Sequence, residues 1–136
     1  MATAGYSGIP LLQKLGIKHG MKVLTLNPPK NYFQLLQSDI TKQYVSPDET
    51  PDFIHLFAET NTIFKNEMKK VLRISKKNSS VVVWISWYKK ASGMATDLTE
   101  DLIRNFALEN GFVDIKVCAI SNEWSGLKLV VPVSKR

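Results

Sequence analysis

The segment that follows the apolar run 80–87 combines charges and backbone able to hold an anion. Residues 88–96 read YKKASGMAT, in which Lys89 and Lys90 are cationic and Gly93 can adopt the positive φ that lets backbone approach a ligand closely. We expect a helix to begin at Asp97, and the first N–H groups of a helix attract phosphates and carboxylates. The predicted ligand-binding residues of this segment are Lys89, Lys90, Ser92, Gly93, Thr96 and Asp97.

A purely structural explanation of this segment stays open. In that explanation Asp97 caps its own helix, with Glu100 three residues later as in a capping box. The two lysines would then be solvated, and Gly93 would only turn the chain. The Asp97 carboxylate would occupy the N–H groups that a ligand needs.

Residues at the ends of other predicted strands would line the same edge of the sheet, because open α/β sheets bind ligands at the carboxyl ends of their strands. Asn27, Glu59 and Ser121 hold such positions, and Ser7 would reach the edge if the first turn folds back. Trp124, in a predicted turn over residues 122–126, is either packed over the sheet edge or displayed to a base or another protein. We expect packing, but Asn27 and Trp124 complete the predicted ligand-binding set.

Histidine and cysteine residues do not suggest a catalytic or metal site. His55 alternates with Phe53 and Phe57, which predicts a buried neutral histidine with one hydrogen bond. Cys118 alternates with apolar residues and is expected in the core. His19, His55 and Cys118 lack paired spacing, so we predict no metal ligands and no nucleophile–base pair. A single cysteine also fits a reducing cytoplasm.

The positive charge of the chain is concentrated in its middle. The net charge is +6, and residues 61–90 carry eight Lys and Arg residues against Glu67 alone. That field favours an anionic partner. Most such helical faces are merely solvated, and residues 61–77 lack the interleaved aromatics typical of nucleic-acid binding. No window approaches about 18 consecutive apolar residues, so we expect no membrane partner.

Alternating patterns predict a single α/β domain over residues 1–136. Apolar residues on both faces of 52–59 and 80–87 indicate central strands. Residues 38–51 read as a surface loop. The predicted helices are 11–15, 31–37, 61–77 (capped by Asn61 or Thr62) and one that Asp97 caps and that ends just before Gly111. The predicted strands are 21–27, 52–59, 80–87, 113–120 and an antiparallel 127–133.

The predicted sheet needs cover on both faces. If each strand adds on the same side of its predecessor, right-handed crossovers place all connecting helices on one face. The other face is too apolar to stay wet. Helix 11–15, a reversal of strand order or a second subunit would cover it, so monomer and homodimer both stay open.

Three blocks carry a resemblance to a known family: GYSGIPLLQKLGIKHGMKV, KKASGMATDLTED and VDIKVCAISNEWSGLKLV. They resemble the signature blocks of a family of short bacterial proteins defined only as a domain of unknown function. This resemblance implies a bacterial cytoplasmic protein and supplies no activity.

A weaker resemblance concerns the fold. The ending of the chain, a helix, a strand and a reversed strand, is similar to the carboxyl half of S-adenosylmethionine-dependent methyltransferases, which implies a Rossmann-like domain of two or three layers. The chain departs from that family because LNPPKNY follows the first strand in place of a glycine-rich loop. The segment before the second strand is also too short for the two strands that complete the nucleoside pocket.

These observations favour a small non-catalytic module that holds an anionic ligand, such as a nucleotide or phosphate, or docks a protein partner at the strand ends. A reduced methyltransferase-like enzyme that uses S-adenosylmethionine is the alternative. A nucleic-acid-associated protein acting through the basic 61–77 helix is a third hypothesis. The sequence identifies no cofactor.

Overall fold

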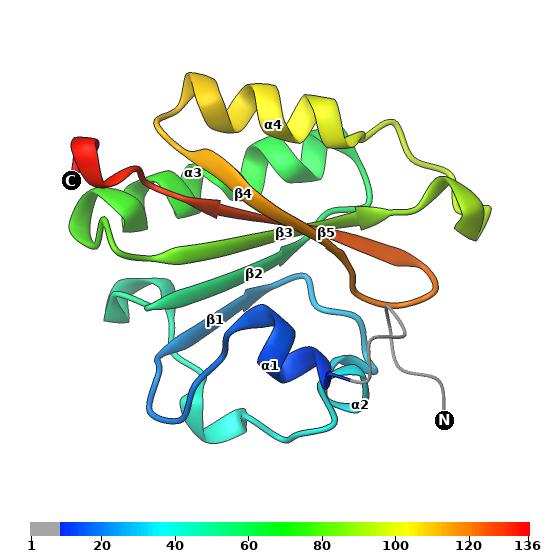
Figure 1. Ribbon diagram of the computed structural model, residues 1–136, viewed down its shortest axis with the longest axis horizontal. Helices are drawn as coiled ribbons and strands as arrows, with labels where there is room; N and C mark the ends of the chain where they lie inside the picture. The colour runs from blue at the N-terminus through cyan, green and yellow to red at the C-terminus, as the bar shows by residue number, and fades with distance from the viewer. Residues whose placement is uncertain (1–8) are drawn as a thin grey trace.

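The computed structural model describes residues 9–136, which form one five-stranded sheet with helices on both faces (Figure 1). The strand order is β1-β2-β3-β5-β4. This Rossmann-like, three-layer α/β arrangement confirms the predicted fold class. The strands are β1 (Val23–Leu26), β2 (Phe53–Phe57), β3 (Val82–Tyr88), β4 (Val113–Ala119) and β5 (Trp124–Val130).

Strands β1, β2 and β3 are parallel neighbours, and β5 enters between β3 and β4 in the opposite direction. Every residue of β2 is buried, as both-face apolarity predicts for a central strand. β5 begins at Trp124, three residues earlier than expected, so this tryptophan lies in a strand and not in a turn. Pairing of Trp124 with Tyr88 at the end of β3 extends the strand to that point.

Two long helices cover one face of the sheet, above it in Figure 1: α3 (Asn61–Lys77) and α4 (Glu100–Glu109). The buried side of α3 repeats at helical spacing through Phe64, Met68, Val71 and Ile74. Thr60 caps α3, since its side-chain oxygen accepts the Ile63 N–H at 3.2 Å; the predicted caps one or two residues later were wrong.

Two short helices cover the opposite face: α1 (Leu11–Leu15) and α2 (Tyr32–Leu36). Leu15 and Leu36 are fully buried there, beside aromatic side chains from the sheet. The Trp84 indole N–H donates to the Leu15 carbonyl at 2.9 Å and fastens α1 to β3. The prediction that helix 11–15 covers this face of the sheet is therefore confirmed.

The segment between β1 and β2 differs from a simple crossover helix. Val23 bonds to β2 on one side and forms a parallel bridge with Tyr44 on the other. The chain thus runs along the outer edge of β1 before it enters β2, which lets α2 lie on the face opposite α3. Short 3-10 turns occupy the predicted loop at Thr41–Gln43 (η2) and Pro47–Glu49 (η3).

Candidate functional site

The carboxyl ends of the parallel strands meet at one edge of the sheet. Asn27 follows β1, Glu59 lies two residues beyond β2, and Lys89 follows β3 directly. β4 runs parallel to β3 because both are antiparallel to β5, so Ser121 reaches the same edge. Ser7, the remaining candidate for this edge, lies outside the described residues.

The loop after β3 is shaped by its own hydroxyl and glycine. A 3-10 turn, η4 (Lys90–Ser92), ends at Gly93 with φ of 74°, as the glycine predicts. The Ser92 hydroxyl donates to the Lys89 carbonyl at 2.6 Å and accepts a backbone N–H two residues later at 3.1 Å. Ser92 therefore supports the turn. The Lys89 N–H donates to the Glu123 carbonyl at 2.9 Å, which fixes the loop to the β4–β5 turn.

The prediction that Asp97 begins and caps α4 was wrong. α4 begins at Glu100, and its cap is Thr99, whose side-chain oxygen accepts the Leu102 N–H at 3.2 Å. The Asp97 carboxylate instead accepts the Asn61 N–H at the start of α3, at 2.8 Å. Asp97 thus links the segment before α4 to the start of α3, and its carboxylate does not cap α4.

Burial of Leu98, which is 2% exposed, explains this late start of α4. The chain must turn into the core at Leu98 before it can begin a helix along the surface. The Thr96 hydroxyl oxygen accepts the Leu98 N–H at 3.0 Å and stabilises that turn. On α4 itself, Ile103 and Ala107 are buried, whereas Leu102 is 41% exposed.

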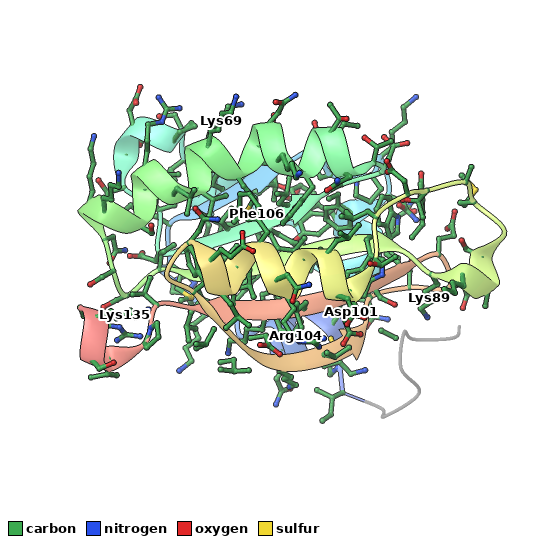
Figure 2. All side chains as sticks on the ribbon, turned by 90° about the horizontal axis from the view of Figure 1, so that it is seen from above. Lys69, Lys89, Asp101, Arg104, Phe106 and Lys135 are labelled. Carbon is green, nitrogen blue, oxygen red and sulfur yellow. The ribbon has the colours of Figure 1, made fainter. Side chains whose placement is uncertain are left out.

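A groove of about 680 Å³ lies between the end of β3, this loop and the start of α4. Three of the predicted residues line it, Lys89, Lys90 and Thr96. Its lining also includes apolar surface and the carboxylates of the first turn of α4, and Figure 2 shows Lys89 and Asp101 at the same end of the molecule. The remaining lining residues are Trp87, Tyr88, Ala91, Leu98, Thr99, Glu100 and Ser125.

Arg104 holds the carboxylates at the start of α4. Its guanidinium contacts Glu100, donates to Asp101 at 3.1 Å, and donates to Asp114 on β4 at 3.0 Å. The Glu100 and Asp114 carboxylates, in that order, raise the pKa of Arg104. One guanidinium offsets only part of the charge of three carboxylates, so Glu100 and Asp101 still oppose an incoming anion, but less than they would without Arg104.

Trp124 lies at the same edge but is packed, with 7% of its surface exposed. Its ring stacks on Tyr88 with centroids 4.3 Å apart and meets the edge of Phe57 at 5.0 Å. The packing alternative for Trp124 is confirmed. Its contribution to the edge is indirect, because it holds the Tyr88 ring beside the groove.

Asn27 lines a second groove of about 490 Å³ with acidic character, away from the two lysines. Glu59 and Glu67 belong to this groove. The Tyr88 hydroxyl donates to Glu59 at 3.2 Å and lies between the two grooves. Partial burial, followed by the Glu59 charge, raises the pKa of Tyr88. The structure therefore separates Asn27 from the Lys89–Lys90 groove.

His55 makes two buried hydrogen bonds where the sequence predicts one. Its Nδ1 lies 2.8 Å from the Tyr32 hydroxyl, and its Nε2 lies 2.7 Å from Ser86 Oγ. Burial lowers the pKa of His55 to about 3, which keeps the ring neutral as predicted. The His55–Ser86 pair was missed, because the two residues belong to different strands and meet only through the pairing of β2 with β3.

This histidine–serine pair offers no access to a substrate. Both residues are 0% exposed, and Tyr32 is 3% exposed. Stacking of His55 on Phe57, with centroids 4.2 Å apart, closes the ring within the core. The pair therefore gives the buried polar atoms of both residues a hydrogen-bond partner. It stabilises the face of the sheet that α1 and α2 cover.

Cys118 and the acidic residues in 9–136 form no metal-binding group. Cys118 is partly buried against the core of α1 and α2, and burial raises the pKa of its thiol. Among residues 9–136, no three His, Cys, Asp or Glu side chains are grouped to hold a metal ion. Within the same residues, no helix is both long and apolar enough to cross a membrane.

No protein-family model matches the chain, and no curated protein is similar to it in sequence. An uncharacterized protein from Listeria monocytogenes serotype 4b has a similar structure, with a TM-score of 0.52 and 11% identity. The alignment covers 89% of this chain and 66% of that one, so the chain spans slightly less than two thirds of its length. At this identity the similarity shows the fold alone.

A protein in the NADB-Rossmann superfamily from Streptococcus agalactiae aligns with a TM-score of 0.47 and 10% identity. That alignment covers 89% of this chain and 67% of the other. The fold class therefore rests on the strand order and the helices on both faces. The resemblance to a bacterial family of unknown function stays a prediction.

Proposed function

We propose that this protein is a non-catalytic binding module that holds an anionic ligand in the Lys89–Lys90 groove. The observation that carries the proposal is the placement of both lysines beside a groove at the carboxyl edge of the sheet. Neither lysine forms an ion pair with any residue in 9–136. Their charge is therefore available to a phosphate or carboxylate.

The remaining lining favours a ligand that combines an anion with a flat or apolar part. Trp87 and Leu98 supply apolar wall, and Tyr88 supplies an aromatic ring held by Trp124. The first N–H groups of α4 favour negative charge, although Glu100 and Asp101 offset part of this effect. A nucleotide fits this combination better than a bare sugar or an amine.

Binding without catalysis is proposed because the groove lining contains no histidine or cysteine. Its carboxylates at the start of α4 are paired with Arg104, which leaves them poorly suited as a general base. The single cysteine, Cys118, agrees with a reducing cytoplasm as the place of action. Docking of a protein partner at the same edge would use the same lysines.

Methyl transfer with S-adenosylmethionine remains the alternative function. The reversed β5 between β3 and β4 favours it. Against it, β1 is the outer strand of the sheet within residues 9–136, apart from the single bridge to Tyr44. Asn27, with φ of 56°, and two prolines stand where that family has its glycine-rich loop.

Calorimetric titration of the protein with ATP, AMP, adenosine, inorganic phosphate and S-adenosylmethionine tests this proposal. We expect saturable binding of a nucleotide, and at least a tenfold loss of affinity in the Lys89→Ala/Lys90→Ala variant with little change in melting temperature. Lys65→Ala/Lys69→Ala on α3 removes the same charge elsewhere and should bind normally.

Equal affinity in the two double variants would overturn the Lys89–Lys90 site. Saturable binding of S-adenosylmethionine without binding of ATP or AMP would support the enzyme alternative instead. Absence of binding for all five probes would reject the nucleotide or phosphate proposal.

A further inference from the structure

We propose a second site, on the opposite edge of the sheet, that binds the phosphodiester backbone of single-stranded nucleic acid without sequence preference. The site is a groove of about 280 Å³ between the second half of α3 and the turn η3, called the α3 groove here. It is independent of the Lys89–Lys90 groove. Its charged lining residues are Lys70, Arg73, Lys76, Lys77 and Asp48.

The wall opposite α3 is held in place by local contacts. η3 begins with a capping box, in which the Ser46 N–H donates to the Glu49 carboxylate at 2.9 Å. The Lys22 ammonium donates to the Glu49 carbonyl at 2.9 Å and ties the turn to the residue before β1. These hydrogen bonds fix the turn that forms the wall of the groove opposite α3.

The cations that line the α3 groove outnumber the carboxylates that pair with them. Lys70 lies 3.3 Å from Glu67, but Arg73, Lys76 and Lys77 form no ion pair with any residue in 9–136. Lys76 and Lys77 also lie in the last turn of α3, where cations complement the helix dipole. Arg73 lies a full turn earlier, so the dipole does not account for it.

The cations continue beyond the groove in a row along α3. Lys65, Lys69, Arg73 and Lys77 are all exposed and lie at intervals of four residues. The row spans roughly 18 Å at about 1.5 Å per residue. Figure 2 shows Lys69 on the side of α3 away from α4. A small anion would contact one or two of these cations, whereas successive phosphates of a polymer in the α3 groove can contact Arg73, Lys76 and Lys77 together.

A nucleic acid fits this surface better than a membrane or an acidic protein partner. Among residues 9–136, the exposed large hydrophobic side chains include none from α3, so a lipid surface would find no apolar anchor there. The groove is small and concave, with Ile74 and Pro47 as apolar lining. The lining contains no aromatic side chain on which a base could stack, so binding rests on the phosphates and carries no sequence preference.

Fluorescence polarisation with a labelled 20-nucleotide oligo(dT) tests the proposal. Contacts from Arg73, Lys76 and Lys77 to three phosphates give a slope of log K against log salt of about −2. The affinity should therefore fall about twentyfold between 50 and 200 mM salt. Arg73→Ala/Lys77→Ala should weaken binding at least tenfold at 50 mM salt and flatten the slope to about −0.7.

Two control variants separate this site from general charge and from the proposed nucleotide site. Arg73→Lys/Lys77→Arg keeps the charges and should keep both affinity and slope. Lys89→Ala/Lys90→Ala should also bind oligo(dT) normally, so failure of one proposal leaves the other testable. Circular dichroism of each variant confirms that the fold is intact.

Three outcomes would overturn the inference. The first is no binding of oligo(dT) at 50 mM salt. The second is equal binding by the wild type and Arg73→Ala/Lys77→Ala. The third is retention of the protein on vesicles of phosphatidylserine and phosphatidylcholine, dependent on Arg73 and Lys77, without binding of the oligonucleotide.

Discussion

One face of the sheet is covered by helices of 17 and 10 residues, and the other by two helices of five residues each. Below the long helices, buried hydrophobic side chains from α3, α4 and the sheet form one large cluster. Below the short helices, the core includes His55, Tyr32 and Ser86 joined by hydrogen bonds, together with the Trp84–Leu15 contact. A long amphipathic helix can cover a sheet by apolar packing, whereas short helices depend on large aromatic side chains and on specific hydrogen bonds that fix their position.

The largest effect should come from truncating a core aromatic below the long helices. Phe64→Ala removes a fully buried ring of α3 and should lower the free energy of unfolding by about 3–5 kcal/mol, measured by urea denaturation. Phe33→Ala on α2 is the matched change on the other face, where the ring is only partly buried. The loss for Phe33→Ala should be smaller because less of its ring is buried, and a loss as large as that for Phe64→Ala would show that burial does not decide the cost.

Acid should destabilise the face of the sheet that α1 and α2 cover, because His55 lies in its core. Its pKa is about 3 in the folded protein, below the ordinary value of 6.5, so the unfolded chain binds a proton first as pH falls. Its contribution to stability is complete above pH 6.5 and is lost toward pH 3, at about 1.4 kcal/mol per pH unit.

Urea denaturation at pH 7 and pH 5 measures this contribution, with an expected loss of about 2 kcal/mol. His55→Phe removes the titrating group, so the pH slope of the variant should be smaller whatever its stability at pH 7. This window lies above the range where Asp39 and Glu49 titrate, since hydrogen bonds lower the pKa of both carboxyls. An unchanged slope in His55→Phe would show that other groups cause the acid sensitivity.

The smallest of the three effects should come from deleting one hydroxyl. Tyr32→Phe leaves His55 Nδ1 buried without its 2.8 Å partner and should destabilise the protein by about 1–2 kcal/mol in thermal or urea unfolding. Tyr88→Phe removes an exposed hydroxyl bonded to Glu59 and should change stability by less than about 0.5 kcal/mol. Equal effects would mean that the buried network contributes nothing specific.

Most of the fold could be predicted from local sequence patterns. The span 11–15 matched α1 because Pro10 and Gly16 flank it, and both-face apolarity identified β2 and β3 as central. The start of α4 could not be predicted in this way. Asp97 has the residue type of a cap, but the burial of Leu98 and the N–H of Asn61 decide its role, and both depend on tertiary structure.

Local sequence patterns also predicted only part of the candidate site, because the rest depends on how the strands pair. Lys89, Lys90 and Thr96 line one groove because they follow one strand, whereas Asn27 lies in another groove with Glu59. Trp124 was expected in a turn, since the sequence does not reveal that β5 extends to the end of β3. The α3 groove needed the position of η3, which no local pattern specifies.

The insertion of β5 between β3 and β4 has a consequence for synthesis on the ribosome. Among the described strands, β4 bonds only to β5, so it can join the sheet only after residues 124–130 have been made. The first three strands pair in the order in which they emerge, while the fourth must wait for the fifth. Until then, the side chains of Ile115 and Val117 lie on a strand without a partner, and exposed apolar side chains on an unpaired strand favour aggregation.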